Sequence, residues 1–250
     1  VDEIKKLIRD DTILVCVTSI DSEIGIRQPI EEIGKFLKNY PNCYFHTDAT
    51  QAIGKVDIDL KDVDLATITP HKFSGLNGFG MLIKKKHVGL KPLINGGRST
   101  TIYRSGTPVL ANVVALDKAL DIALKNREER YNYVNKFYKI IIEKLKNYDR
   151  VIINNTKNSI PFTINFSIKG IKSLDFVKKL EEYDIYVSTK TSCCPSESPS
   201  KMVYALTKDK NLASSSVRIS LSHLTKEEEI NEFLKVFDKC YKELCINAEV

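Results

Sequence analysis

Apolar strand segments alternate with helical segments in the first half of the sequence, and this order restricts the fold more than any other feature. Residues 13–18 form a continuous apolar run, which predicts a strand buried on both faces. Further strands are predicted at residues 43–47, 65–69 and 79–83. Pro29 opens a predicted helix that ends near Tyr40 and has an apolar face made of Ile30, Ile33, Gly34 and Leu37. The pattern predicts an α/β fold with a parallel or mixed sheet covered by helices.

The second half of the chain has a different pattern. Residues 109–147 are predicted to be helical, with an apolar stripe at Val134, Tyr138, Ile141 and Leu145. The charged cluster at residues 126–130 interrupts this region and marks a kink or a domain junction. Beyond it, strands are predicted at residues 160–167, 185–188 and 217–221, and helices at residues 174–183, 200–206 and 226–244. The sequence therefore predicts an α/β domain over residues 1–124 and a smaller α+β domain over residues 125–250.

Composition and charge argue against two classes of partner. The 250 residues include 38 Lys and Arg against 32 Asp and Glu, and the resulting charge of +6 is scattered along the chain. The densest basic run, residues 84–86, follows a predicted strand and reads as a solvated strand end rather than a nucleic-acid patch. No apolar run approaches the roughly 18–20 residues that span a bilayer. We expect neither a nucleic acid nor a membrane as partner.

The spacing of the cysteines argues against a metal site. Six cysteines occur, at positions 16, 43, 193, 194, 240 and 245, with no C-x-x-C pair and only four His in the chain. The first two lie in apolar strand-like runs and are predicted core residues, and the last two lie on a predicted helix. A chain of this size needs no disulfide framework, so we expect a reducing, cytoplasmic compartment. Cys193 and Cys194 lie in a polar stretch, where a thiol would be accessible and reactive.

Two groups of polar residues follow neighbouring predicted strands. Asp48 and Gln51 come directly after the strand at residues 43–47, although Asp48 could instead cap a short helix. Lys72 comes just after the strand at residues 65–69, although a lone loop lysine is the commoner case. In open α/β sheets, ligands bind at the carboxyl ends of the strands. An acid and a lysine placed there suit pyridoxal phosphate (PLP), because the lysine can form a Schiff base while the carboxylate keeps the pyridine nitrogen protonated.

Six motifs together carry a resemblance to one enzyme family. They are Glu23-Ile24-Gly25; Gln28-Pro29-Ile30; His46 to Gln51 with Gly54-Lys55; Thr69-Pro70-His71-Lys72; Gly96-Gly97 with Arg104-Ser105-Gly106-Thr107; and Pro199-Ser200 with Ser215-Ser216-Val217-Arg218. In this order and spacing the chain resembles the cysteine desulfurases, class V aminotransferase relatives among the fold-type I PLP-dependent enzymes. The resemblance implies a partial large PLP-binding domain over residues 1–124 and the small domain over residues 125–250. It also implies a homodimer with sites at the subunit interface.

The resemblance implies roles for the residues that match the family motifs. Lys72 would be the Schiff-base lysine. Asp48 would pair with the pyridine nitrogen, and Gln51 with the phenolic oxygen of the cofactor. Thr69 and His71 would hold the phosphate. The resemblance also implies a catalytic role for His71.

Further implied roles lie outside the sheet edge. Thr107 would contact the cofactor phosphate of the partner subunit, and Arg218 would bind the substrate carboxylate. Cys193 would take sulfur from L-cysteine as a persulfide and release L-alanine, with Cys194 as an incidental neighbour. The sulfur would pass to an acceptor or scaffold protein for iron–sulfur cluster or thio-cofactor assembly.

Departures from the family pattern keep two alternatives open. Ser22, expected at the cofactor, replaces a family Asn, and residues 98–101 and 222–223 also differ from the pattern. These changes favour, as the first alternative, a class V enzyme that acts on another amino acid. Family chains also carry an upstream part with a phosphate-binding loop and a ring-stacking His, and neither is found in this sequence. The second alternative is therefore an inactive fragment or a non-catalytic interaction module.

Overall fold

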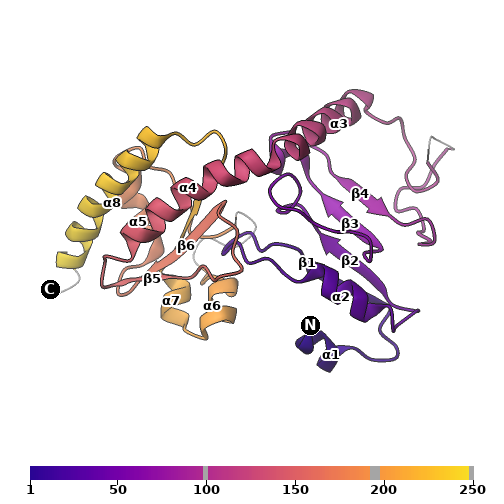
Figure 1. Ribbon diagram of the computed structural model, residues 1–250, viewed down its shortest axis with the longest axis horizontal. Coiled ribbons are helices and arrows are strands. Elements are labelled where there is room, and N and C mark those ends of the chain that lie inside the picture. Colours follow the sequence, from indigo (N-terminus) through magenta and orange to yellow (C-terminus); the bar gives the residue numbers. More distant parts are fainter. Residues whose placement is uncertain (98–100, 192–197, 248–250) are drawn as a thin grey trace. The chain divides into compact units, whose positions relative to one another are not determined.

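The computed structural model describes residues 1–97, 101–191 and 198–247 (Figure 1). Its contacts divide the chain into two compact units. The first unit contains residues 1–20 and 28–127, and the second contains residues 21–27 and 128–250. The short segment 21–27 thus belongs to the second unit, although both of its neighbours in the chain belong to the first.

The first unit is built on a four-stranded mixed sheet. Its strands, in spatial order, are β1 (Leu14–Thr18), β2 (Tyr44–Asp48), β3 (Leu65–Ile68) and β4 (Met81–Lys84). The first three strands are parallel, and β4 pairs antiparallel with β3. Asp48 lies opposite Thr18 on one side and Thr67 on the other, so the carboxyl ends of three strands meet at one edge. This topology confirms the predicted α/β fold class.

Helices cover one face of this sheet. The first unit contains α1 (Asp2–Leu7), α2 (Ile30–Leu37), the 3-10 helix η1 (Pro70–Phe73) and α3 (Leu110–Lys125). The four predicted apolar residues of α2 are all buried, which confirms the periodicity argument. Three of them, Ile30, Ile33 and Leu37, pack with Phe45 and Ala66 of the sheet. Leu116 and Ala123 of α3 pack with Ile68 and Phe73. The two helices thereby fix the positions of β2 and β3 and of the turn that follows β3.

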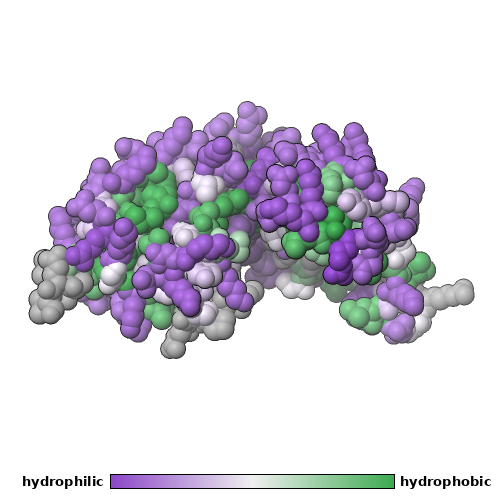
Figure 2. All heavy atoms as spheres, turned by 90° about the horizontal axis from the view of Figure 1, so that it is seen from below, coloured by the Kyte–Doolittle hydropathy of each residue, from purple (hydrophilic) through white to green (hydrophobic). Residues whose placement is uncertain are grey.

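The prediction that the first strand is buried on both faces is wrong. Only Val15 and Val17 of β1 pack against the α2 cluster. The alternate residues Leu14 and Cys16 are exposed, because β1 is an edge strand and its second face lacks a cover among the described residues. Cys16 is therefore not a core residue, whereas Cys43 is buried as predicted. Figure 2 shows that the visible surface is mostly hydrophilic and also carries patches of exposed apolar residues.

This difference in exposure predicts different thiol reactivity. Burial, together with the nearby Asp64 carboxylate, raises the pKa of the Cys43 thiol, so less of the nucleophilic thiolate is present. We expect iodoacetamide to modify Cys16 at least about tenfold faster than Cys43 near neutral pH. Peptide mass spectrometry over a time course measures both rates in one sample. Equal rates would contradict the burial of Cys43.

The second unit is an α+β arrangement. Its antiparallel sheet contains β5 (Val151–Ile153), β6 (Thr163–Ile168) and β7 (Ser216–Ser220). Its helices are α4 (Arg127–Leu145), α5 (Ser173–Glu181), α6 (Lys201–Thr207), α7 (Lys210–Ser214) and α8 (Glu227–Asn247). An aromatic cluster of Phe166, Phe176 and Phe237 joins β6, α5 and α8. None of the helices in the described part of the chain is both long and apolar enough to cross a membrane.

The long helical region breaks where the charged cluster predicts a kink. Asn126 lies between α3 and α4 and donates a side-chain hydrogen bond of 2.9 Å from Nδ2 to the Ile122 carbonyl. This bond caps the end of α3. The predicted strand at residues 185–188 is absent from the structure, where Ser188 forms only an isolated bridge with Arg218. The short elements β5 and α7 were not predicted.

Candidate functional site

Asp48 is held at the carboxyl end of β2 by its main chain. Its carbonyl oxygen accepts hydrogen bonds from the Ser19 N–H at 2.9 Å and the Ser19 hydroxyl at 2.8 Å. Its Oδ1 accepts the Thr50 N–H at 2.9 Å, the local cap that the sequence left as an alternative. A carboxylate has about four acceptor positions, so this bond leaves capacity for a further donor. The cap and a ligand-binding role are therefore compatible.

Gln51 lies in the turn that follows Asp48. Its Oε1 accepts a hydrogen bond of 2.6 Å from Lys55 Nζ, which orients the side-chain amide and leaves its NH2 group as the donor end. Gly54 closes the turn with φ of 73°, and a Cβ there would lie 2.8 Å from the Ala123 Cβ of α3. The family-like glycine is thus needed both for the backbone angle and for the close approach of α3.

Lys72 is presented by a short, well-anchored turn after β3. Thr69 is extended, and the 3-10 helix then begins at Pro70. Pro70 and Phe73 are buried, whereas His71 and Lys72 between them are exposed. The Lys72 N–H donates to the Thr69 carbonyl at 3.2 Å. Apolar anchors at both ends of the turn therefore direct an imidazole and an amine outward at the same sheet edge as Asp48.

Arg218 and Ser22 meet in the second unit. Arg218 lies on β7, and its Nη1 donates a hydrogen bond of 3.2 Å to the carbonyl oxygen of Ser22. The contact uses the Ser22 main chain and not its hydroxyl. Burial lowers the pKa of Arg218, and the carboxylates of Glu23 and Asp21 act in the opposite direction. Arg218 Nε is buried and has no hydrogen-bond partner among the described residues, so this orphaned donor fits an anionic ligand such as a carboxylate.

Two buried charged residues of the second unit were missed by the site prediction. Glu23 is 3% exposed and Lys190 is 6% exposed. Glu23 accepts hydrogen bonds from the hydroxyls of Thr191 and Ser200, and Lys190 donates to Ser198. Glu23 stands in one of the quoted motifs, but only the fold shows that its side chain is buried. No sequence pattern predicts the burial of Lys190, which is a single charged residue in a Ser- and Thr-rich stretch.

The remaining predicted site residues lie elsewhere. Thr107 is exposed in the segment that precedes α3. Cys193 and Cys194 fall within residues 192–197, which lie outside the described part of the chain. The structure thus gathers Asp48, Gln51, Thr69, His71 and Lys72 at one sheet edge of the first unit, and Ser22 with Arg218 in the second unit.

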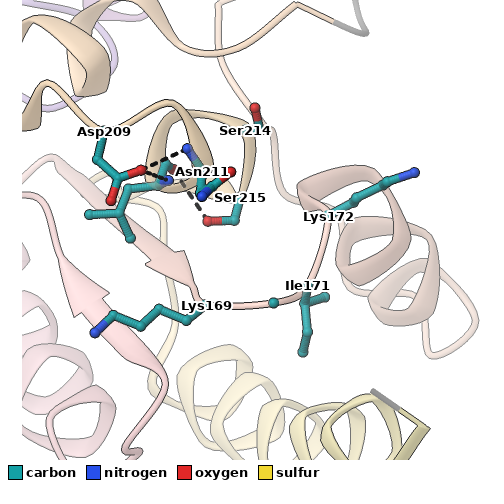
Figure 3. Close-up of a pocket in the computed structure, with 9 residues that line it drawn as sticks. Lys169, Ile171, Lys172, Asp209, Asn211, Ser214 and Ser215 are labelled. Atoms are coloured by element: carbon teal, nitrogen blue, oxygen red, sulfur yellow. Dashed lines mark hydrogen bonds between the residues drawn. The ribbon is translucent and has the colours of Figure 1, made fainter. Parts of the chain in front are cut away.

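A cavity in the second unit is separate from these residues. It has a volume of about 530 Å³ and lies between the segment around Gly170 and helix α7 (Figure 3). Its two lysines, Lys169 and Lys172, extend in opposite directions, so their ammonium groups do not converge on one ligand (Figure 3). Asp209 uses its carboxylate to cap α7. The cavity therefore offers no concentrated charge for recognition and holds none of the predicted site residues.

Comparison with known proteins identifies the family. Residues 1–233 match the family model for aminotransferase class-V. The chain belongs to the aminotransferase class-V family. This result confirms the resemblance drawn from the six motifs, and with it the expectation of an α/β fold related to PLP-dependent enzymes.

Several class V relatives are cysteine desulfurases by name. The chain is 36% identical to "Cysteine desulfurase IscS" of Clostridium botulinum over 250 residues, which cover 97% of this chain and 63% of the relative. It is 34% identical to "Cysteine desulfurase" of Rattus norvegicus, covering 92% of this chain and 52% of the relative. This class V chain thus spans less than two thirds of the length of these curated relatives.

Solved structures agree with this assignment. A structure titled "NIFS-LIKE PROTEIN" superimposes with a TM-score of 0.88 at 31% identity, covering 96% of this chain and 64% of that one. A NifS-like protein from Rickettsia africae superimposes with a TM-score of 0.82 at 29% identity, covering 92% of this chain and 62% of that one. The class V fold is therefore shared along nearly the whole chain.

Proposed function

We propose that the protein is a PLP-dependent cysteine desulfurase. It would convert L-cysteine to L-alanine and leave the sulfur as a persulfide on Cys193. The observation that carries this proposal is the register of the first sheet, in which Asp48 lies opposite Thr67, and the 3-10 helix with Lys72 begins three residues later, at Pro70. An acid and an amine from adjacent strand ends are the pair that PLP chemistry needs.

The residues at this edge fit the cofactor. Asp48 retains acceptor capacity for a ring N–H, and Gln51 has a donor end for the phenolic oxygen. Thr69 and His71 would hold the phosphate beside Lys72. When bound, PLP supplies an electron sink for the bonds at the substrate α-carbon. Thr107 would contact the cofactor phosphate of a second copy.

The sulfur transfer would be performed by a thiolate of this chain. The Cys193 sulfur attacks the substrate sulfur, so an S–S bond forms and the substrate C–S bond breaks. The bonding electron pair stays with the substrate carbon, which takes up a proton and becomes the methyl group of L-alanine. Sulfur is oxidised and carbon is reduced by the same two electrons, so no external oxidant is needed for this step.

Arg218 would bind the substrate carboxylate through its free Nε and its second Nη. We expect Arg218→Met to lower kcat/KM for L-cysteine by about 30-fold or more, mainly through KM, because a buried charge-assisted contact is worth about 2 kcal/mol or more. Arg218→Lys keeps the charge but loses the planar fork, so it should recover only part of the loss. The exposed Arg9→Met serves as the control. A wild-type KM in Arg218→Met would contradict this role.

The proposed activity is tested on the full-length protein with PLP and L-cysteine. We expect alanine and persulfide sulfur in equal amounts in a single turnover, and alanine with sulfide when a thiol reductant is present. D-cysteine and L-serine are the control substrates. If no alanine forms from L-cysteine or from the control substrates, the desulfurase proposal is contradicted.

A class V enzyme acting on another amino acid is the second candidate. The sequence favours it in one respect, since Ser22 stands where the resemblance implies an Asn, and the hydrogen bond from Arg218 uses only the main-chain carbonyl of Ser22. A panel of L-amino acids separates the two candidates. Turnover of another amino acid at a higher kcat/KM than L-cysteine would select the second.

Partners and location follow from the same proposal. We propose a homodimer, supported by the exposed apolar side chains Leu110, Val113 and Val114 along α3. A sulfur-acceptor or scaffold protein for iron–sulfur cluster or thio-cofactor assembly would receive the sulfur. The free thiols of Cys16, Cys43, Cys240 and Cys245 support a reducing, cytoplasmic location. Residues 1–124 would be part of the large PLP-binding domain, and residues 125–250 the small domain.

A further inference from the structure

Three consecutive main-chain carbonyls of segment 21–27 each accept a hydrogen bond from a side chain of the second unit. These carbonyls belong to residues 22–24, and we call them the carbonyl row. Their donors, in chain order of the carbonyls, are Arg218 Nη1 at 3.2 Å, Asn165 Nδ2 at 3.1 Å and Asn155 Nδ2 at 3.1 Å. The guanidinium that is proposed to bind the substrate therefore shares one short turn with two neutral amides.

Asn165 approaches the carbonyl row from the strand next to Arg218. It lies on β6, is fully buried, and is the direct partner of Arg218 in the register of β6 and β7. Directly opposed residues of an antiparallel pair place their side chains on the same face of the sheet, with Cβ atoms about 4.5–5.5 Å apart. The amide and the guanidinium therefore reach adjacent carbonyls from adjacent strands.

The orientation of each amide is set by another amide. The Oδ1 atom of Asn165 accepts Asn154 Nδ2 at 2.7 Å, so the NH2 group of Asn165 is directed to the Glu23 carbonyl. The main-chain N–H of Asn165 donates to Asn155 Oδ1 at 2.7 Å, which directs the NH2 group of Asn155 to the Ile24 carbonyl. Asn165 is thus the residue through which the two contacts to the carbonyl row are coupled.

A polar face on a buried strand needs a reason. The residues of β6 alternate between an apolar set and a polar set, and both sets are buried. The apolar set is Ile164, Phe166 and Ile168, and the polar set is Thr163, Asn165 and Ser167. A buried amide costs free energy unless its hydrogen bonds are made, whereas an apolar side chain has no such requirement. A network that satisfies its hydrogen bonds in one geometry fixes its members in place, which apolar packing does less strictly.

The carbonyl row determines which edge of the guanidinium is left for a ligand. Nη1 of Arg218 is held by the Ser22 carbonyl, while the buried Nε has no hydrogen-bond partner among the described residues. Nε and Nη2 together form a two-donor edge of the kind that binds a carboxylate bidentately. A shift of the Ser22 carbonyl would turn the guanidinium and misalign this edge.

We propose that Asn165, assisted by Asn155, positions the Arg218 guanidinium for a substrate carboxylate by holding the carbonyl row in place. Both are positioning residues, because they act on Arg218 through the main chain of residues 22–24. The proposal rests on the proposed function only in that Arg218 binds the α-carboxylate of an amino acid. It adds that affinity for that amino acid depends on a neutral amide of the neighbouring strand.

The amide network is tested by hydrogen–deuterium exchange of the full-length protein, followed by peptide mass spectrometry. We expect the amides of residues 21–27 to exchange at least about tenfold more slowly than those of the exposed residues 76–78. Asn165→Ala should accelerate exchange at residues 21–27 several-fold, whereas Asn132→Ala, at an exposed position of α4, should leave it unchanged. Equal exchange of the two segments in the wild type would overturn the proposal, even if Asn165→Ala fails to fold.

The positioning role is tested by kinetics of the PLP-loaded protein. We expect Asn165→Ala to raise KM for L-cysteine by about tenfold, while kcat and the Kd for PLP change less than about threefold. A variant that merely loosens the fold would weaken PLP binding and lower kcat as well. An unchanged KM in a folded Asn165→Ala variant overturns the positioning role.

A double-mutant cycle with Arg218 distinguishes positioning from general destabilisation. In an Arg218→Met background, Asn165→Ala should change KM less than about twofold, because the group that it positions is already absent. The same tenfold rise in both backgrounds would show that Asn165 does not act through Arg218, and would overturn the proposal.

These results separate the positioning role from the function on which it rests. A wild-type protein that forms no alanine from L-cysteine refutes the desulfurase proposal, and the cycle is then measured with the L-amino acid that the protein does turn over. If it turns over none, fast exchange at residues 21–27 overturns the network as well. A wild type that forms alanine, with additive effects in the cycle, refutes the positioning role alone.

Discussion

Replacing Lys72 with alanine is expected to remove the visible absorption band that PLP gives on binding the protein, and to lower alanine formation by about 10³-fold or more. Lys72 is exposed at the sheet edge, between the buried anchors Pro70 and Phe73. Its loss therefore removes the amine that would bond the cofactor in the proposed function, without removing a side chain from the core. Titration with PLP, followed by absorption spectroscopy, measures the first effect.

Two variants make the Lys72 experiment specific. Lys61→Ala removes another exposed lysine of the same unit and should keep both the absorption band and the activity. Lys72→Arg keeps the positive charge but cannot form the covalent link at neutral pH, so it should behave like Lys72→Ala. A full absorption band in Lys72→Ala would assign the cofactor to a different lysine. It would refute the hypothesis that the lysine after β3 bonds PLP.

Replacing Cys193 with serine is expected to lower alanine formation by about 10³-fold or more while PLP binding remains. In the proposed function the sulfur has no acceptor without the Cys193 thiolate, whereas the residues proposed to hold the cofactor at the first sheet are unchanged. Single-turnover alanine formation and trapping of the persulfide with an alkylating reagent measure the loss directly.

The adjacent cysteine provides the matched control. Cys194→Ser should keep at least about half of the wild-type alanine formation, since the resemblance aligns Cys193 with the nucleophile. The reverse result, with activity lost in Cys194→Ser and kept in Cys193→Ser, would move the nucleophile by one residue. Full activity in both single variants would exclude a sulfur transfer that depends on either thiol alone.

Periodicity explains which elements could be predicted from the sequence. Helix α2 has an apolar face of four residues and a proline before its first turn, and all four residues are buried. The charged cluster at residues 126–130 indicates the helix break, which occurs at Asn126, directly before α4. The three-residue β5 and the five-residue α7 are too short to show a period, so they could not be found.

Burial could not be predicted as well as element type. The apolar run of β1 was read as buried on both faces, but an apolar composition does not say which strands lie at a sheet edge. Cys16 and Cys43 lie in similar runs, and only their places in the sheet separate an exposed thiol from a buried one. Strand order depends on long-range pairing, which leaves no local pattern.

The sequence by itself determined the local chemistry of this protein. Residue types and their spacing placed an acid at the carboxyl end of β2 and a lysine after β3, because strand ends and turns are local features. Only the tertiary structure decided that segment 21–27 joins the second unit and that the Ser22 carbonyl binds Arg218. It also decided that the side chains of Glu23 and Lys190 are buried. Those contacts join residues far apart in the chain, and their free energy depends on burial and geometry that no local pattern records.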